Sequence, residues 1–253
     1  MKKLLLTALI AVAVMTTSVR AQDAFATQMK VYGTALKYYD LQTATTALYN
    51  AMALKPERKD LRDSLANIYF LGERYGQAYT IGEEILKEDP KRDDILAIVA
   101  VSKQSLGFAK EALEDYEKLY KDSKQIFYLY QIASLQHQLK RVGECLASLD
   151  QIIADDASTK QMVSLRNGNG TSQNVPMKAA AINLKGIITL ELNQSANARA
   201  LFNEAIKMFP DFEAAKSNIA IMDQQDAAAA AQAKGGAGTA APKSAPAPKP
   251  AGK

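Results

Sequence analysis

Large apolar, small and polar residues recur along the chain at a fixed interval. Ala78 has Ala44 34 residues before it and Ala112 34 residues after it, and Pro90 has Pro56 at the same interval. A period between about 20 and 50 residues is typical of proteins that stack one supersecondary unit many times. The pattern therefore predicts a repeat architecture, in which no unit buries its apolar residues alone.

Within each unit the large and small residues keep the same offsets. Residues 65–90 show the pattern most fully, with Ala66, Tyr69 and Ala78 inside them. Small residues allow two helices to cross closely, and the ring of Tyr69 is expected to fill the adjacent gap. Burial of one such large side chain contributes roughly 1.5–3 kcal/mol.

These offsets resemble the tetratricopeptide repeat (TPR), a family in which two antiparallel helices share 34 residues. The family pattern has an apolar and then a small residue in the first helix, an aromatic residue three positions later, an alanine in the second helix and a closing proline. The resemblance covers about residues 25–156 and 179–212. In the last unit the equivalent residues are Gly186, Ala198, Phe202, Ala205 and Pro210.

The resemblance implies an all-α, TPR-like α-solenoid of about five repeats over residues 22–225. Gly72 lies near the end of a first helix, where we expect it to take the left-handed backbone conformation. Pro90 is expected to end the second helix of the same unit. Cys145 stands in the slot of Ala78, so we interpret it as a buried substitute for alanine rather than a nucleophile.

An insertion separates the fourth and fifth units. Cys145 and Ala198 are 53 residues apart, which is 19 more than one period. Residues 157–178 contain two Asn-Gly pairs between the segments "VSL" and "NVP", and Asn-Gly is a strong signal for a β-hairpin. A protruding hairpin that contributes to a binding surface and an irregular, disordered loop are both compatible with this segment.

Two further segments follow the repeats. Residues 211–225 are predicted to form one amphipathic helix that caps the open end of the array. Residues 226–253 are rich in Ala, Pro and Lys and contain no aromatic residue. Such a composition cannot bury enough apolar surface to offset the entropy of ordering, so we expect a disordered tail whose first alanines can extend a helix.

The N-terminus has the features of a secretory signal peptide. Lys2 and Lys3 precede an apolar run of eleven residues, and Val19-Arg20-Ala21 is a small-x-small cleavage site. A membrane-spanning helix needs roughly 20 apolar residues, so the run is too short to span. We expect cleavage after Ala21, residues 1–21 to be removed, and a periplasmic or secreted mature protein.

The distribution of charge argues against nucleic-acid binding. The formal net charge of the chain is +4, but residues 22–226 carry 24 basic and 27 acidic residues. A nucleic-acid binder would concentrate positive charge on its folded part. We therefore expect protein or peptide partners, no nucleic acid and no membrane span.

The residue types that catalysis requires are scarce. His137 is the only histidine and Cys145 the only cysteine, eight residues away. A metal site needs clustered ligands, and there is no phosphate-binding loop and no G-x-G-x-x-G motif. We therefore expect no enzymatic activity, no metal and no cofactor.

The candidate site is the concave groove that first helices line in TPR proteins, at the second, fifth, ninth, twelfth and thirteenth positions of each repeat. The resemblance carries these positions over to this chain as the predicted groove residues Asn67, Phe70, Leu71, Val101, Gln104, Phe127, Tyr130, Ser134, His137, Asn183 and Leu190. The alternative for each apolar position is packing between repeats.

Some TPR proteins bind a peptide's C-terminal carboxylate with Lys and Asn at the fifth and ninth positions. Here Asn67 is present, but Asp63 stands where Lys belongs. A groove of Phe, Tyr, Val, Leu, Asn and Gln suits a mostly uncharged peptide or helix better, with the aromatic residues as anchors.

The sequence thus favours a non-catalytic interaction scaffold in a bacterial cell envelope, similar to exported TPR proteins of Bacteroidota-type bacteria. Two alternatives belong to other functional classes. One is a periplasmic chaperone-like or assembly factor that binds unfolded clients. The other is a wall-associated structural protein tethered by its tail.

Overall fold

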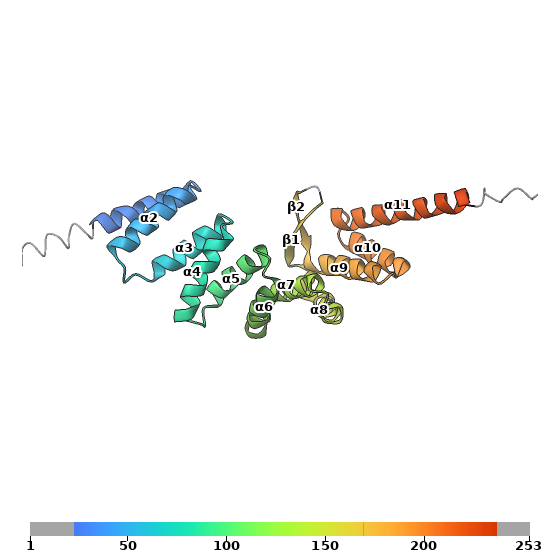
Figure 1. Ribbon diagram of the computed structural model, residues 1–253, viewed down its shortest axis with the longest axis horizontal. Coiled ribbons are helices and arrows are strands. Elements are labelled where there is room, and N and C mark those ends of the chain that lie inside the picture. The colour runs from blue at the N-terminus through green and yellow to red at the C-terminus, as the bar shows by residue number, and fades with distance from the viewer. Residues whose placement is uncertain (1–22, 169, 237–253) are drawn as a thin grey trace, which may run out of the picture. The chain divides into compact units, whose positions relative to one another are not determined.

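The computed structural model describes residues 23–168 and 170–236 (Figure 1). The predicted signal peptide, residues 1–21, and residues 237–253 of the predicted tail lie outside this range. The chain divides into two compact units, Met1–Ser148 (unit 1) and Leu149–Lys253 (unit 2). Helices make up most of the described part of both units.

Unit 1 is a succession of helices, of which α2 to α7 each pack against the next (Figure 1). The first helix spans residues 23–37. It is followed by α2 (Leu41–Leu54), α3 (Asp60–Leu71), α4 (Tyr75–Glu88), α5 (Asp93–Ser105), α6 (Ala109–Ser123), α7 (Ile126–Gln138) and α8 (Val142–Ala154), the last of which continues into unit 2.

These helices form the predicted pairs. The first helix of each repeat is here named an A helix, and the A helices are helix 23–37, α3, α5 and α7. The second helix of each repeat is named a B helix, and the B helices are α2, α4, α6 and α8. Besides the contacts between successive helices, α3 packs against α5, which is the A helix of the next repeat. The prediction of an all-α array of helix pairs is confirmed.

Small residues occupy the helix crossings, as the repeat pattern predicts. Ala66, Ala78, Ala100 and Ala112 are all fully buried. Cys145 is fully buried as well, and its thiol donates a hydrogen bond to the carbonyl of Ala133 at 3.1 Å. The interpretation of this cysteine as a packing residue is confirmed.

The turn from an A helix to its B helix has the same backbone in each of the described pairs. One residue takes a positive φ in each turn, namely Tyr39 (55°), Glu73 (54°), Gly107 (85°), Lys140 (59°) and Asn193 (60°). The following residue then donates its N–H to the carbonyl five residues earlier, as Arg74 does to Tyr69 at 2.8 Å. This 6→1 bond is the Schellman pattern that satisfies a carbonyl at a helix end.

The expectation that Gly72 takes the left-handed conformation is wrong. Its φ is −85°, and the left-handed residue is its neighbour Glu73. The absence of a side chain at Gly72 matters for a different reason. A Cβ there would lie 3.3 Å from Cδ1 of Leu41 on α2 and 3.3 Å from the carbonyl oxygen of Ile68. Gly72 therefore permits the close approach of the preceding B helix.

Unit 2 combines helices with a two-stranded sheet. After α8 it contains the 3-10 turn η1 (Asp156–Thr159), β1 (Met162–Arg166), β2 (Ser172–Pro176), α9 (Met177–Glu191), α10 (Ser195–Met208) and α11 (Glu213–Gly236). Helix α9 packs against α10, and α11 packs against both (Figure 1).

The insertion forms the predicted hairpin rather than an irregular loop. Strands β1 and β2 pair antiparallel, with Val163 opposite Val175 and Leu165 opposite Gln173. Both valines are buried, and the two strands contact α9. Alternation along the strands therefore places an apolar side of the hairpin on unit 2.

Gln173 connects the hairpin to the start of α11. Its Nε2 donates to the carbonyl of Asp211 at 2.6 Å, and its Oε1 accepts from the N–H of Glu213 at 3.2 Å. Glu213 is the first residue of α11, so this amide satisfies one of the backbone donors that a helix start leaves without partners. The hairpin thus holds the last helix in place.

Helix α11 is longer than the predicted capping helix. It begins at Glu213 and runs to Gly236, through the alanines that follow Asp226. Alanine is the residue with the highest intrinsic helix propensity, which explains the extension into a segment with almost nothing to pack against. Met222 is its last buried residue up to residue 232.

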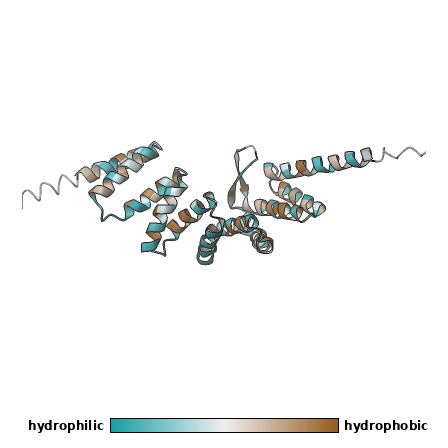
Figure 2. Cartoon of the chain, viewed as in Figure 1, coloured by the Kyte–Doolittle hydropathy of each residue, from teal (hydrophilic) through white to brown (hydrophobic). Residues whose placement is uncertain are grey.

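Hydropathy follows the packing. Helices α5 and α9 carry long apolar stretches, whereas hydrophilic residues dominate the ribbon of α6 (Figure 2). Within the residues that the structure describes, no helix is both long enough and apolar enough to cross a membrane.

The crossing at Gly186 provides a test of the packing. A Cβ there would lie 2.6 Å from Cε1 of Phe202, which is fully buried. We expect Gly186→Ala to lower the free energy of unfolding by about 1–2 kcal/mol, since overpacking outweighs the gain in helix propensity. Thermal unfolding followed by circular dichroism measures the change.

Gly33→Ala is the matched control. Gly33 is an exposed helical residue with no atom within 4 Å of a built Cβ. The control should raise the melting temperature, since alanine gains up to about 1 kcal/mol in a helix interior. A melting temperature for Gly186→Ala equal to or above that of the wild type would contradict the proposed crossing.

Candidate functional site

Most of the predicted groove residues lie on the A helices of unit 1. We name their side of that unit the A-helix face, comprising Asp63, Asn67, Phe70, Leu71, Val101, Gln104, Phe127, Ser134 and His137. The A helices run in the same direction because each is followed by an antiparallel B helix. Residues near their starts therefore gather at one end of the face, and residues near their ends gather at the other.

The end formed by the helix starts is charged, and its charges are paired. Arg92 contacts Oδ2 of Asp63 at 2.9 Å and Oδ2 of Asp94 at 2.7 Å. The hydrogen bonds that Arg92 donates to Asp94, and then to Asp63, raise the pKa of its guanidinium. Asp63 stands at the position of the clamp lysine and is bound to Arg92, so neither of these two side chains offers an unpaired cation for a peptide carboxylate.

The end formed by the C-terminal ends of the A helices carries apolar side chains of α3 at its surface. Leu71 is 65% exposed, and Phe70 is half-buried with its ring edge-on to Tyr75 at 6.2 Å. Asn67 is exposed and donates to the carbonyl of Asp63 at 2.8 Å. An apolar ligand could cover Phe70 and Leu71 without stripping water from a charge.

A chain of hydrogen bonds runs across the middle of the face. The hydroxyl of Tyr116 donates to Oε1 of Gln104 at 2.8 Å, and Nε2 of Gln104 donates to Oε1 of Gln131 at 3.3 Å. These bonds link α6, α5 and α7. They fix the orientation of the Gln104 amide and use one of its two N–H donors, whereas the Gln131 amide accepts in this chain and keeps both N–H donors for a ligand.

The two predicted aromatic anchors on α7 lie in different environments. Phe127 is 37% exposed and stands edge-on to Tyr128 at 5.7 Å. Tyr130 is only 7% exposed, and burial raises the pKa of its hydroxyl. Tyr130 therefore contributes to packing, and Phe127 is the accessible ring.

Three further predicted residues are partly exposed. Val101 packs against the apolar cluster built around Tyr116 and Leu119, and Ser134 and His137 lie along α7. These residues continue the uncharged surface from α5 onto α7.

The last two predicted groove residues, Asn183 and Leu190, belong to unit 2, where α11 contacts the same helix. Asn183 is 5% exposed, and its Oδ1 accepts a hydrogen bond from Nδ2 of Asn218 at 3.0 Å. Leu190 packs in a cluster that includes Met222 and Ile219 of α11. Within unit 2 a helix of the same chain thus covers these two positions.

Sequence reasoning missed a recurring slot near the C-terminal end of each A helix of unit 1. The slot is filled by Tyr69 in the second repeat, by Lys103 in the third repeat and by Gln136 in the fourth repeat. The hydroxyl groups of Tyr69 and Tyr49 form a hydrogen bond of 2.7 Å. The side-chain oxygen of Gln136 accepts a hydrogen bond from the hydroxyl of Ser148 at 2.9 Å. The 34-residue step from Tyr69 to Lys103 was the signal that could have revealed it.

Lys103 makes the most polar version of this slot. Its Nζ lies 2.9 Å from Glu83 on α4 and 2.7 Å from Asp115 on α6, and 5.7 Å from the centroid of the Tyr79 ring. Burial acts to lower the pKa of Lys103, but the hydrogen bonds with Asp115 and Glu83 outweigh it and raise the pKa. The ammonium group thus stays charged and links two B helices.

Comparisons with known proteins identify the fold. No protein-family model matches the sequence, and no curated protein sequence matches it. Solved structures do match, among them YrrB, described as a TPR protein with an unusual peptide-binding site. It has a TM-score of 0.58 and 15% identity, over 76% of this chain and 89% of that one.

Two MamA structures are also similar. MamA from Desulfovibrio magneticus RS-1 has a TM-score of 0.60 and 10% identity, over 76% of this chain and 98% of that one. A second MamA structure has a TM-score of 0.57 and 10% identity, over 73% of this chain and 91% of that one. Together with the helix pairs, these likenesses show that the chain has a TPR-like α-solenoid fold.

Replacing Lys103 tests the polar slot. The side chains of Lys103 and Asp115 are 12% and 5% exposed. Lys103→Met leaves the Asp115 carboxylate buried without its closest cation, and we expect a loss of about 3 kcal/mol in the free energy of unfolding. Chemical denaturation measures the loss.

Two further variants separate charge from packing. Lys118 also contacts Asp115, but its side chain is 63% exposed, so Lys118→Met should cost less than about 1 kcal/mol. The double variant Lys103→Met/Asp115→Leu should recover most of the stability, since no buried charge remains. Equal losses for the Lys103 and Lys118 variants would contradict the buried ionic link.

Proposed function

We propose that this protein is a non-catalytic interaction scaffold, and that a segment of a partner protein docks on the A-helix face of unit 1. The observation that carries the proposal is the division of that face. At its charged end Arg92 pairs with Asp63 and Asp94, while its other end leaves Leu71 exposed and Phe70 half-buried, near the Asn67 amide. Such a surface suits a partner with apolar anchors and few charges.

The expected partner segment is an uncharged peptide or helix with a bulky apolar side chain. Phe70 and Leu71 at one end of the face, and Phe127 near the start of α7 at the other, would contact its apolar side chains. The amides of Asn67 and Gln131 would hydrogen-bond its polar groups. Unit 2 provides an intramolecular analogue. There α11 contacts Asn183 through an asparagine amide and places Met222 and Ile219 in the cluster of Leu190.

The structural neighbours support this class of function. YrrB is described as a TPR protein with a peptide-binding site, although the low identity carries no residue over to this chain. The scarcity of catalytic residue types in the sequence supports a role without chemistry. We infer docking rather than turnover as the mechanism.

We further propose that the protein acts outside the cytoplasm of a bacterium, in the periplasm or after secretion. The support is the signal-peptide pattern of residues 1–21, which ends at Ala21. N-terminal sequencing of the protein recovered from its native host should begin at Gln22. A first residue other than one near Gln22 would contradict cleavage there.

A double substitution tests the A-helix face. Phe70→Glu/Phe127→Glu places two carboxylates where an apolar partner would have to desolvate them, so partners should be lost at least tenfold. In-cell crosslinking followed by purification and mass spectrometry measures partner recovery. Phe70 is half-buried and Phe127 is exposed, whereas a glutamate at buried Tyr130 would destabilise the fold and not test the surface.

Leu192→Glu is the matched control, since Leu192 is 48% exposed and lies in a turn of unit 2. Its partners should remain, and both variants should keep the wild-type melting temperature. Unchanged partners in the double variant would contradict the proposed face. A broad set of denatured clients would instead favour a chaperone-like factor. Loss of localisation after deletion of residues 235–253 would favour a tail-tethered structural protein.

A further inference from the structure

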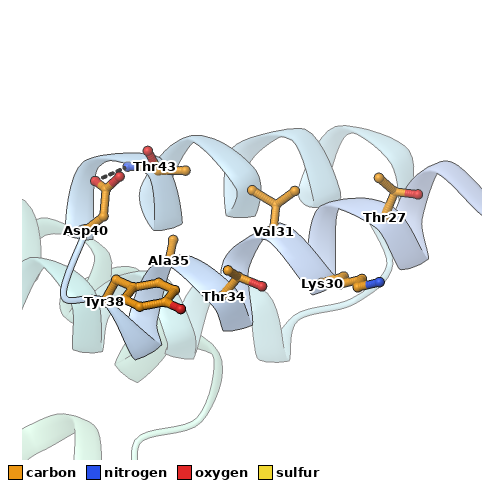
Figure 3. Close-up of a pocket in the computed structure, with 8 residues that line it drawn as sticks. All are labelled: Thr27, Lys30, Val31, Thr34, Ala35, Tyr38, Asp40 and Thr43. Atoms are coloured by element: carbon orange, nitrogen blue, oxygen red, sulfur yellow. Dashed lines mark hydrogen bonds between the residues drawn. The ribbon is translucent and has the colours of Figure 1, made fainter.

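The N-terminal flank of unit 1 carries a second surface, separate from the A-helix face. A cavity of about 380 Å³ lies along helix 23–37 and the start of α2. It is lined by Thr27, Lys30, Val31, Thr34, Ala35, Tyr38, Asp40 and Thr43 (Figure 3). Val31 is 38% exposed and Tyr38 is 71% exposed, so much of its apolar lining faces solvent.

The repeat interval shows what this flank is built to contact. Thirty-four residues after Thr27, Val31 and Ala35 stand Leu61, Leu65 and Tyr69. In α3 these three residues are 1%, 1% and 5% exposed, because α2, the preceding B helix, packs against α3. In the part of the chain that the structure describes, helix 23–37 has no preceding B helix.

Ala35 leaves space where other repeats have a large side chain. It occupies the slot that holds Tyr69, Lys103 and Gln136 in the three following repeats. Ala35 itself is 6% exposed and forms the floor of the cavity, while the Tyr38 ring lies beside it (Figure 3). A helix that docks here must therefore bring its own bulky side chain to fill the slot.

We propose that this flank binds an amphipathic helix of another protein, with one bulky apolar or aromatic side chain seated over Ala35. The site is equivalent, one repeat earlier, to the flank of α3 that α2 covers, where Tyr49 of α2 reaches Tyr69. A bulky side chain in such a pocket is the usual anchor of a helix-in-groove interaction.

Charge adds a preference for an acidic residue on the docked helix. Lys30 lines the cavity and has no ion-pair partner among residues 23–168 and 170–236. At the interface between the second and third repeats, Glu83 of the B helix α4 lies 2.9 Å from Lys103 of the A helix α5. An acidic residue beside the anchor would give Lys30 a similar partner.

A second copy of the chain is a poorer occupant. Its helices α2 to α10 are engaged in their own pairs, and the exposed end of α11 spans residues 223–232. That end contains only Asp, Gln and Ala, so it offers no bulky apolar anchor. Neither helices α2 to α10 nor the exposed end of α11 therefore supplies the required side chain.

The test uses the α2 sequence as a probe, since α2 covers the equivalent flank of α3. A fluorescein-labelled peptide of residues 40–54, stapled on its exposed side because short helices are marginal in water, is titrated into the full chain. Fluorescence anisotropy should show saturable binding. A peptide with Tyr49→Ser, which lacks the anchor, should bind at least tenfold more weakly.

Ala35→Tyr is the decisive variant, because its side chain fills the slot as Tyr69 does in the second repeat. It should reduce peptide affinity at least tenfold while keeping the melting temperature, and Tyr38→Ala should weaken binding without affecting the fold. Phe70→Glu, on the A-helix face, should leave the affinity unchanged, which separates this site from the proposed function.

Three outcomes would overturn the proposal. One is the absence of saturable binding, and another is equal affinity for Ala35→Tyr and wild type, which would place the peptide elsewhere. The third is concentration-dependent self-association in sedimentation velocity that Ala35→Tyr abolishes, since a second copy would then occupy the flank.

Discussion

The structure depends on helix crossings that leave no space for a side chain. A Cβ at Gly186 would lie 2.6 Å from the ring of Phe202, and one at Gly82 would lie 2.4 Å from Cγ2 of Val99. The first crossing joins the two helices of a pair, and the second joins one pair to the next. Because helices meet this closely, each unit must place its small residues at the same offsets, and each turn must return the chain at the same angle. The shared left-handed residue, borne by Glu73, Lys140 and Asn193 without a glycine, shows how strongly that geometry is imposed.

Within this fixed frame one slot varies, and its variation decides what each interface does. Tyr69 forms an apolar contact with a hydroxyl pair at its edge, Lys103 forms an ionic link between two B helices, and Gln136 forms an amide contact. Ala35 leaves the slot open. The backbone tolerates all four because the slot lies beside the crossing rather than at it. A repeat protein can therefore change its internal contacts and its binding surfaces without changing its fold.

The sequence predicted the fold well because packing offsets are visible in residue size. Its Asn-Gly pairs indicated a hairpin as one of two possibilities for the insertion, and the structure shows the hairpin, with Val163 paired to Val175. It failed at Gly72, since a glycine needed for close approach looks the same as one needed for a left-handed turn. It described the candidate site less well, because exposure depends on neighbours that the offsets do not reveal. Tyr130 and Phe127 are both aromatic residues at groove positions, and only the structure shows which of them is buried.

The two candidate surfaces of unit 1 differ in what the chain itself demonstrates about them. For the A-helix face, α11 shows in unit 2 that a helix can cover groove positions by pairing an asparagine amide with Asn183 and adding apolar contacts. For the N-terminal flank, α2 shows on α3 that a B helix can bury the equivalent stripe almost completely. Each surface thus has an intramolecular counterpart in the same chain, and the chemistry of that counterpart defines the partner. A partner of the A-helix face needs amides and apolar side chains, and a partner of the flank needs one bulky anchor side chain. The two surfaces would therefore select different partners.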